Sequence, residues 1–237
     1  MLCLITITQA QNAPPRRDPR VSAELRRMVA AYKKLGAFSV SSQDVKKIDV
    51  YQLRRRNSLG RFGLPGRVAL RIEELNSQNV KQSVSIVRLM DGKNFIESQN
   101  GGPAQQQTLP AASVKGSDSR LQRFFAPSLG LESLASILES GALPLQESEP
   151  NTVTPRFQIL PGGESLIEAH AQTWRSSGDL AASVFRFHIG KNGFLKRLEY
   201  SIGQAPGRLT GTAILSTPTP INAQTAFRWQ EFAPRPK

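Results

Sequence analysis

The stretch of residues 183–203, SVFRFHIGKNGFLKRLEYSIG, constrains the fold of this chain more than any other. Its apolar residues alternate with polar ones, which is the period-2 pattern of a strand with one dry face. Residues 190–193 tolerate positive φ and allow the chain to reverse tightly. The apolar series is Phe185, Phe187 and Ile189, then Phe194, Leu198, Tyr200 and Ile202, with Lys196 breaking the dry face once. The pattern predicts an antiparallel hairpin without an obvious reactive group, which favours a binding function.

The net charge of +13 is the strongest deviation in composition. It is concentrated early, because residues 1–75 carry 15 Lys or Arg against 6 Asp or Glu. Such an excess favours anionic partners. The alternative is a solvated basic surface, since the basic residues are spread over several segments rather than along one helix face. The densest run, Arg54–Arg56, has no interleaved aromatic residues to stack on bases. We therefore expect no nucleic-acid partner and interpret this run as a solvated strand end.

A single cysteine, Cys3, excludes an intrachain disulfide and a cysteine-based metal site. It lies in a short apolar run followed by small and polar residues, as at the end of a secretory signal. The run is short and no basic residue precedes it, so residues 1–13 are interpreted as a truncated signal segment. Residues 14–20 contain three prolines and predict an extended leader. No segment reaches the roughly 20 apolar residues of a membrane-spanning helix. We expect a periplasmic or otherwise exported protein with a single domain at 21–237.

The first part of the chain predicts a helix and then strands. Ser22 is expected to cap the helix and Gly36 to end it. One apolar stripe recurs at three- and four-residue spacing, at Leu25, Met28, Val29, Tyr32 and Leu35. From residue 38 to residue 90 the pattern predicts strands, interrupted by a glycine-rich turn region at 57–66. Residues 91–93 indicate a hairpin turn that leads into a short strand.

The remainder predicts further strands around a helical insertion. Residues 100–119 are interpreted as a surface loop, and helical pieces are expected at 121–125 and 129–140. Strands are expected at 157–160, 165–171 and 183–202, with a last short strand around Phe227, Trp229 and Phe232. The predicted fold class is α+β. A strongly curved antiparallel sheet forms an incomplete barrel, and the N-terminal and mid-chain helices pack against its concave face.

The spacing of reactive residues does not indicate a catalytic or metal centre. His170 and His188 each stand alone on a predicted strand, without zinc-ligand spacing. No Gly-x-Ser-x-Gly elbow supports a serine triad. The Gly-Lys pairs at 92–93 and 190–191 lack the flanking residues of a phosphate loop. We therefore expect a non-enzymatic protein without a metal or a cofactor.

Four weak motifs occur in a characteristic order. A helix leads through a short turn into LGAFSV at 35–40, and a later strand ends in an Asp-Gly-Lys turn at 85–93. Paired strands surround a Gly/Asn turn at 185–202, and a Phe-containing segment followed by proline closes the chain at 226–234. This order, from about residue 21 onward, resembles the periplasmic lipoprotein carriers, the LolA/LolB-like half-barrels. One departure is the strand at 94–98, NFIES, which is less aromatic than in carriers.

The resemblance implies a cavity that holds lipid, the acyl chains of a lipoprotein or another apolar ligand. It is also compatible with peripheral contact between the protein and a membrane. The candidate cavity residues are Leu25, Met28, Tyr32, Phe38, Leu70, Ile86, Phe185, Phe187, Ile189, Leu198 and Tyr200. Carriers also have a basic residue followed by proline at the end of the third strand. Arg71 is the nearest basic residue here, although Ile72 follows it, and it is the candidate contact for an anionic group.

Two other classes of function remain open. The basic first third also suits an envelope structural or sensory module that binds a protein or an anionic polymer. An enzyme would need an acid/base pair in the cavity, and the sequence shows none.

Overall fold

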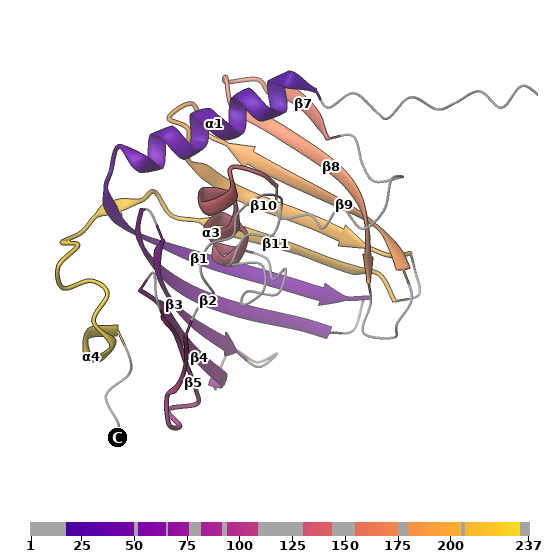
Figure 1. The fold of residues 1–237 in the computed structure, drawn as a ribbon. Coiled ribbons are helices and arrows are strands. Elements are labelled where there is room, and N and C mark those ends of the chain that lie inside the picture. Colours follow the sequence, from indigo (N-terminus) through magenta and orange to yellow (C-terminus); the bar gives the residue numbers. More distant parts are fainter. Residues whose placement is uncertain are drawn as a thin grey trace, which may run out of the picture.

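Two antiparallel meanders, joined along one seam, form the twelve-stranded sheet of this protein (Figure 1). The computed structural model describes residues 18–49, 52–64, 66–75, 82–91, 94–108, 130–143, 155–174, 180–204 and 207–232. The seam is the pairing of β1 (Ala37–Ile48) with β11 (Leu209–Leu215). The sheet is open, because β6 and β7 lie at opposite ends of the strand order. The curved, incomplete barrel and the α+β class predicted from the sequence are confirmed.

Each meander places sequence neighbours side by side. The first continues from β1 through β2 (Gln52–Gly63), β3 (Arg67–Leu75), β4 (Gln82–Met90), β5 (Asn94–Gln99) and β6 (Gln105–Thr108). The second runs from β7 (Arg156–Ile159) through β8 (Ser165–Trp174), β9 (Leu180–Ile189) and β10 (Leu195–Ile202) to β11. The short β12 (Thr219–Pro220) pairs with the start of β1.

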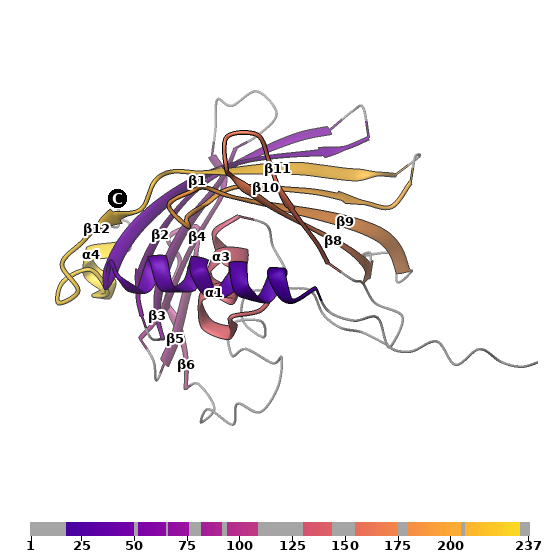
Figure 2. The same ribbon diagram turned by 90° about the horizontal axis from the view of Figure 1, so that it is seen from above.

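Within the described residues, two helices lie on the concave side of the sheet. α1 (Pro19–Lys33) runs along the open side, and α3 (Leu131–Ser140) lies between α1 and the sheet (Figure 2). α1 begins earlier than predicted, because the Asp18 carboxylate accepts a hydrogen bond from the Arg20 backbone N–H and Pro19 occupies the first turn. Proline is tolerated there because its missing N–H has no partner within the helix. The leader predicted at 14–20 therefore becomes helical at Pro19.

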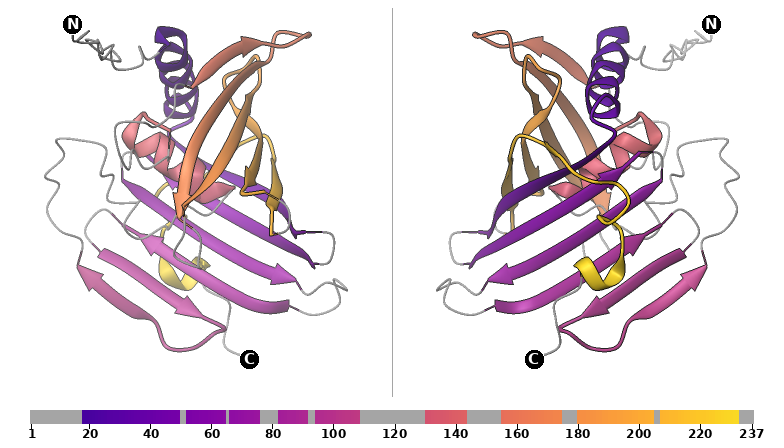
Figure 3. Two further views of the ribbon diagram at one scale, coloured as in Figure 1. Left: turned by 90° about the vertical axis from the view of Figure 1, so that its right-hand side faces the viewer. Right: turned by 90° about the vertical axis from the view of Figure 1, so that its left-hand side faces the viewer.

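The alternation of side chains gives the sheet two different faces. Even-numbered residues of β1 and their register partners face the helices and form the main core. On the convex face a second apolar cluster of Ala69, Val87, Leu89 and Phe232 packs under the C-terminal segment. This segment ends in α4 (Trp229–Phe232), which Figure 3 shows on the opposite side of the first meander from α3.

Several local predictions are wrong, for identifiable reasons. The glycine-rich stretch 57–66 is mostly strand, since β2 continues to Gly63 and the chain turns after it. Residues 105–108 of the predicted loop form the edge strand β6. The predicted last strand near Trp229 is the helical turn α4. The helical piece expected at 121–125 lies outside the described residues.

The hairpin that carries the main alternation is confirmed with one correction. The register between β9 and β10 shifts between Leu195 and Arg197. This bulge turns Leu195 into the core and leaves Lys196 exposed, where its ammonium group pairs with Glu164. Lys196 therefore does not break the dry face.

Candidate functional site

An apolar wall covers the concave face, and all but one of the candidate cavity residues belong to it. They come from α1, from the first meander and from the hairpin of β9 and β10, and each is at most 9% exposed. The members are Leu25, Met28, Tyr32, Phe38, Leu70, Phe185, Phe187, Ile189, Leu198 and Tyr200. Residues of α3 pack against the same cluster, including Leu131, Leu134 and Ile137. The concave wall is therefore continuous, and α3 covers it.

Aromatic rings fasten α1 to this wall. The Tyr32 ring lies 5.0 Å from the Phe38 ring, and the Phe38 ring stacks on Phe62 at 5.1 Å between centroids. The Tyr32 hydroxyl accepts a hydrogen bond of 3.2 Å from the Leu195 backbone N–H. Burial raises the pKa of Tyr32, so the hydroxyl stays protonated. The contacts of Tyr32 and Phe38 therefore pack α1 closely against the concave face of the sheet.

The other two candidate residues have different surroundings. Ile86 faces the concave side in register with Ile72, but it is only half-buried and does not join the main cluster. Arg71 lies on the convex face, where its guanidinium donates a hydrogen bond to the Phe232 carbonyl and lies 5.4 Å from the Phe232 ring. The sheet therefore separates Arg71 from the apolar wall.

A buried polar cluster lies under α3, and the sequence interpretation missed it. The Arg56 guanidinium binds the Asp44 carboxylate (Nε to Oδ2, 3.0 Å) and the Glu132 carboxylate (Nη2 to Oε2, 2.7 Å). Ser42 donates a further hydrogen bond of 2.9 Å to Asp44. Desolvation is the main effect on Asp44, and it raises the pKa of this carboxyl to about 6. Arg56 is thus no solvated strand end, because it joins β1 and β2 to α3.

The hydrogen bonding of this cluster is incomplete. Within the described residues, Glu132 Oε1 and the hydroxyls of Ser58 and Ser136 are buried without a hydrogen-bond partner. Unpaired buried polar atoms carry a desolvation cost. The strand alternation that predicted Phe38 and Val40 on the dry face also places Asp44 on that side, and this signal was available from the sequence.

A second polar row lies next to this cluster, nearer the strand ends. In register across three strands are Arg54 of β2, Lys46 of β1 and Gly211 of β11, and Gly211 pairs with Tyr200 of β10. The Tyr200 ring lies over Gly211 so closely that a Cβ atom there would come within 2.2 Å of the ring. Burial lowers the pKa of Lys46, and the charge of Arg54 lowers it further.

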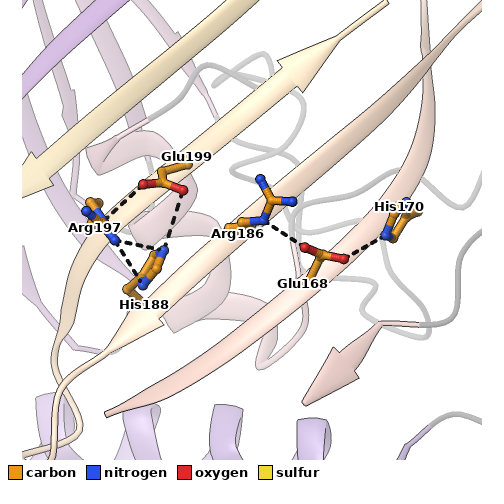
Figure 4. Close-up of polar contacts among 6 residues, drawn as sticks. All are labelled: Glu168, His170, Arg186, His188, Arg197 and Glu199. Atoms are coloured by element: carbon orange, nitrogen blue, oxygen red, sulfur yellow. Dashed lines mark hydrogen bonds and ion pairs between the residues drawn. The ribbon is translucent and has the colours of Figure 1, made fainter. Parts of the chain in front are cut away.

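The convex face of β8–β10 carries a ladder of charges, drawn in Figure 4. Glu168 binds Arg186 at 2.7 Å and His170 at 2.9 Å, while Glu199 lies 3.2 Å from the Arg197 Nε and 3.6 Å from His188. The hydrogen bond from His170 is the main cause of a lowered pKa of Glu168. Burial lowers the pKa of His188. A carboxylate of lowered pKa is a weak base, so Glu168 is poorly suited to general-base catalysis.

Other features of the described residues also lie outside the apolar wall. Two open clefts flank the C-terminal segment, one of about 360 Å³ near Phe227 and one of about 270 Å³ near Thr225. In the described ranges, no group of His, Cys, Asp and Glu is arranged to hold a metal ion. None of the helices described there combines the length and the apolar character needed to cross a membrane.

Comparison with known proteins gives likenesses of structure. No family model and no curated protein matches the sequence. Among solved structures, LprF from Mycobacterium bovis is 13% identical, with 87% of this chain and 98% of that chain covered and a TM-score of 0.37. A LolA superfamily protein from Nitrosomonas europaea is 11% identical, with 88% and 97% covered and a TM-score of 0.44.

Two further structures extend this comparison. A putative outer membrane lipoprotein-sorting protein domain from Vibrio parahaemolyticus is 7% identical, with 90% of this chain and 96% of that chain covered and a TM-score of 0.39. MucB, solved in complex with MucA, is 13% identical with a TM-score of 0.39, and the match covers 91% of this chain but 60% of MucB. At these identities the likeness concerns the arrangement of the chain alone.

Proposed function

We propose that this protein is an exported, non-catalytic binding protein that holds the acyl chains of a lipid or lipoprotein on its concave face. The observation that carries the proposal is the continuous apolar wall formed by α1, β1–β3 and β8–β11. A curved sheet with one apolar face and an open side is suited to enclosing an apolar ligand.

The attachment of α3, which covers this wall, is partly polar. α3 is ten residues long, and part of its contact with the sheet is the Asp44–Arg56–Glu132 cluster. Buried ion pairs stabilise little in net terms, because desolvation of the charges offsets their attraction. Glu132 also leaves one carboxylate oxygen unpaired. We therefore propose that an acyl chain takes the place of α3 on the wall.

Binding of a fluorescent fatty acid tests the proposal, together with native mass spectrometry of protein purified from its own envelope. Phe185 lies at the margin of the wall and is 9% exposed, so Phe185→Asn should weaken binding about tenfold while the sheet still folds. The matched control is Ile214→Asn, at a convex position that is 58% exposed.

The outcome depends on the contrast between these variants. Circular dichroism should show both folded, and only the concave change should affect affinity. No co-purifying lipid, together with no fatty-acid binding by the wild type, would refute the proposal. Equal affinity of the two variants would place the ligand elsewhere.

A second candidate is an envelope module that binds an anionic polymer or a protein. The exposed convex residues Lys47, Arg55 and Arg67 favour it. Binding of a polyanion through this face should weaken steeply as salt rises, whereas fatty-acid binding on the apolar wall should change little. Isotherms at two ionic strengths separate the two functions.

A further inference from the structure

The polar row of Arg54, Lys46 and Tyr200 has the composition of an anion site. Both cations face the concave side, on adjacent strands and directly in register. Lys46 is half-buried, and neither cation makes a hydrogen bond or ion pair with another described residue. A partly desolvated cation without a bound counter-ion gains strongly from an anionic ligand.

The nearby carboxylates are mostly engaged elsewhere. Asp44 and Glu132 share the guanidinium of Arg56. Glu74 is the register partner of Arg56 on β3, and it raises the pKa of Lys46 from a distance without an ion pair to it. The pKa of Lys46 is lowered overall. Burial and the charge of Arg54, which lower this pKa, therefore outweigh the charge of Glu74, which raises it.

Tyr200 connects this row to the apolar wall. Its ring stacks on Phe185 with 6.5 Å between centroids, and its hydroxyl lies over Gly211, the register partner of Lys46. Burial, and then the charge of Asp44, raise the pKa of Tyr200, while the charge of Arg56 lowers it. Glycine at position 211 leaves room for the Tyr200 ring, because a Cβ atom there would clash with it. One residue therefore contacts the surface proposed for acyl chains and borders the cationic row.

We propose that Lys46, Arg54 and the Tyr200 hydroxyl bind a phosphate group at the rim of the concave face. A phosphate offers several acceptor oxygens, which match an ammonium, a guanidinium and a hydroxyl donor. The inference deepens the proposed function, on which it rests, because it assigns the headgroup of the ligand. Amphiphiles with a phosphate beside their acyl chains would satisfy both parts of the concave face.

Calorimetric titration with three probes tests this site: monomeric dihexanoyl phosphatidic acid, uncharged dihexanoylglycerol and inorganic phosphate. The double variant Lys46→Gln/Arg54→Gln should lower affinity for the phosphatidic acid roughly tenfold or more, as expected for loss of charge-assisted hydrogen bonds. Its affinity for dihexanoylglycerol should be unchanged. Tyr200→Phe, which keeps the ring, should give a smaller loss.

The control is Lys47→Gln/Arg55→Gln, which removes the same charge from adjacent residues on the convex face. It should leave all three affinities within about twofold of the wild type. Equal losses in the two double variants would overturn the site, because the effect would then be long-range charge. Melting curves verify that each variant is folded.

The three probes separate this proposal from the proposed function. Binding of dihexanoylglycerol with no gain from the phosphate would overturn the phosphate site and leave acyl-chain binding intact. Inorganic phosphate binding as tightly as the phosphatidic acid, and dependent on Lys46 and Arg54, would keep the site but identify free phosphate as its ligand. Absence of binding by all three probes would overturn both.

Discussion

Asp44 shows how one buried carboxyl couples this fold to pH. Its side chain lies under α3, hydrogen-bonded to Ser42 and paired with Arg56. Desolvation outweighs these contacts, so the folded-state pKa of about 6 lies above the ordinary value of 3.8. Between these two values the folded protein binds more protons than the unfolded chain. The contribution of Asp44 to the stability of the folded protein therefore falls as the pH rises.

The first prediction compares the wild type with Asp44→Asn. From pH 4 to pH 7 the wild type should lose roughly 2–3 kcal/mol of unfolding free energy relative to the variant. Urea unfolding at four pH values measures this difference, and the other titrating groups cancel because both proteins contain them. Parallel pH profiles would contradict the raised pKa.

At this scale the sequence predicted which side chains are apolar and inward, but not how polar ones are paired. Alternation placed Phe187 and Leu198 correctly, because burial of apolar side chains follows strand periodicity. Arg56 was misjudged, since its partner Glu132 is distant in sequence. Lys196 was misjudged because a bulge shifts the register by one residue, and side-chain patterns do not reveal a bulge.

α3 is attached to the sheet by a polar cluster at its first turn and by apolar contacts along its length. Its N-terminal turn, at Gly130 and Glu132, lies directly over the Asp44–Arg56 pair. The helix has no side-chain N-cap. Apolar contacts of Leu131, Leu134, Ala135, Ile137 and Leu138 with the main core supply the rest of its attachment. We therefore expect α3 to separate from the sheet more readily than neighbouring strands separate from each other.

The second prediction removes the central cation. Arg56→Leu leaves Asp44 and Glu132 buried without their shared partner, and should cost about 3–5 kcal/mol near neutral pH. Hydrogen exchange should show α3 amides exchanging faster than those of β9 and β10. The loss should shrink at pH 4, where Asp44 is protonated. Arg55→Leu, on the exposed side of the same strand, should stay within about 0.5 kcal/mol of the wild type.

Helices and strands could be predicted where the periodicity of apolar residues extends over the whole element, and less well where it is interrupted. The stripe of α1 and the hairpin of β9 and β10 are long and regular, and both are confirmed. The glycines of β2 suggested a turn, yet Gly60 lies within the strand, where Phe62 and Leu131 occupy the space that a side chain would need. Tertiary packing overrides local preference there.

At the scale of the whole molecule, the concave wall is filled by side chains and by α3. Phe187 is 1% exposed, and it lies between Ile167 and Leu198 in register across three strands. The third prediction is that Phe187→Glu loses the cooperative thermal transition, because it buries an unpaired carboxylate at a cost of about 4 kcal/mol or more. A melting temperature close to that of the wild type would instead indicate a hollow interior.

The fold class and the curvature of the sheet could be predicted from the sequence, because the alternation gives each predicted strand one apolar face. The pairing of β1 with β11 could not, because the two strands lie far apart in the chain. The candidate cavity residues were mostly brought together, but Arg71 was placed by analogy, and strand parity puts it on the convex face.

The seam between β1 and β11 also orders the assembly of the molecule in time. Ser42 pairs with Leu215, so the edge of the first meander remains open until β11 has been made. Contacts this distant in sequence are slow to form. Until β11 arrives, neither meander can complete the concave wall. The chain therefore has a long interval in which the first meander has been synthesised but its edge is not yet paired.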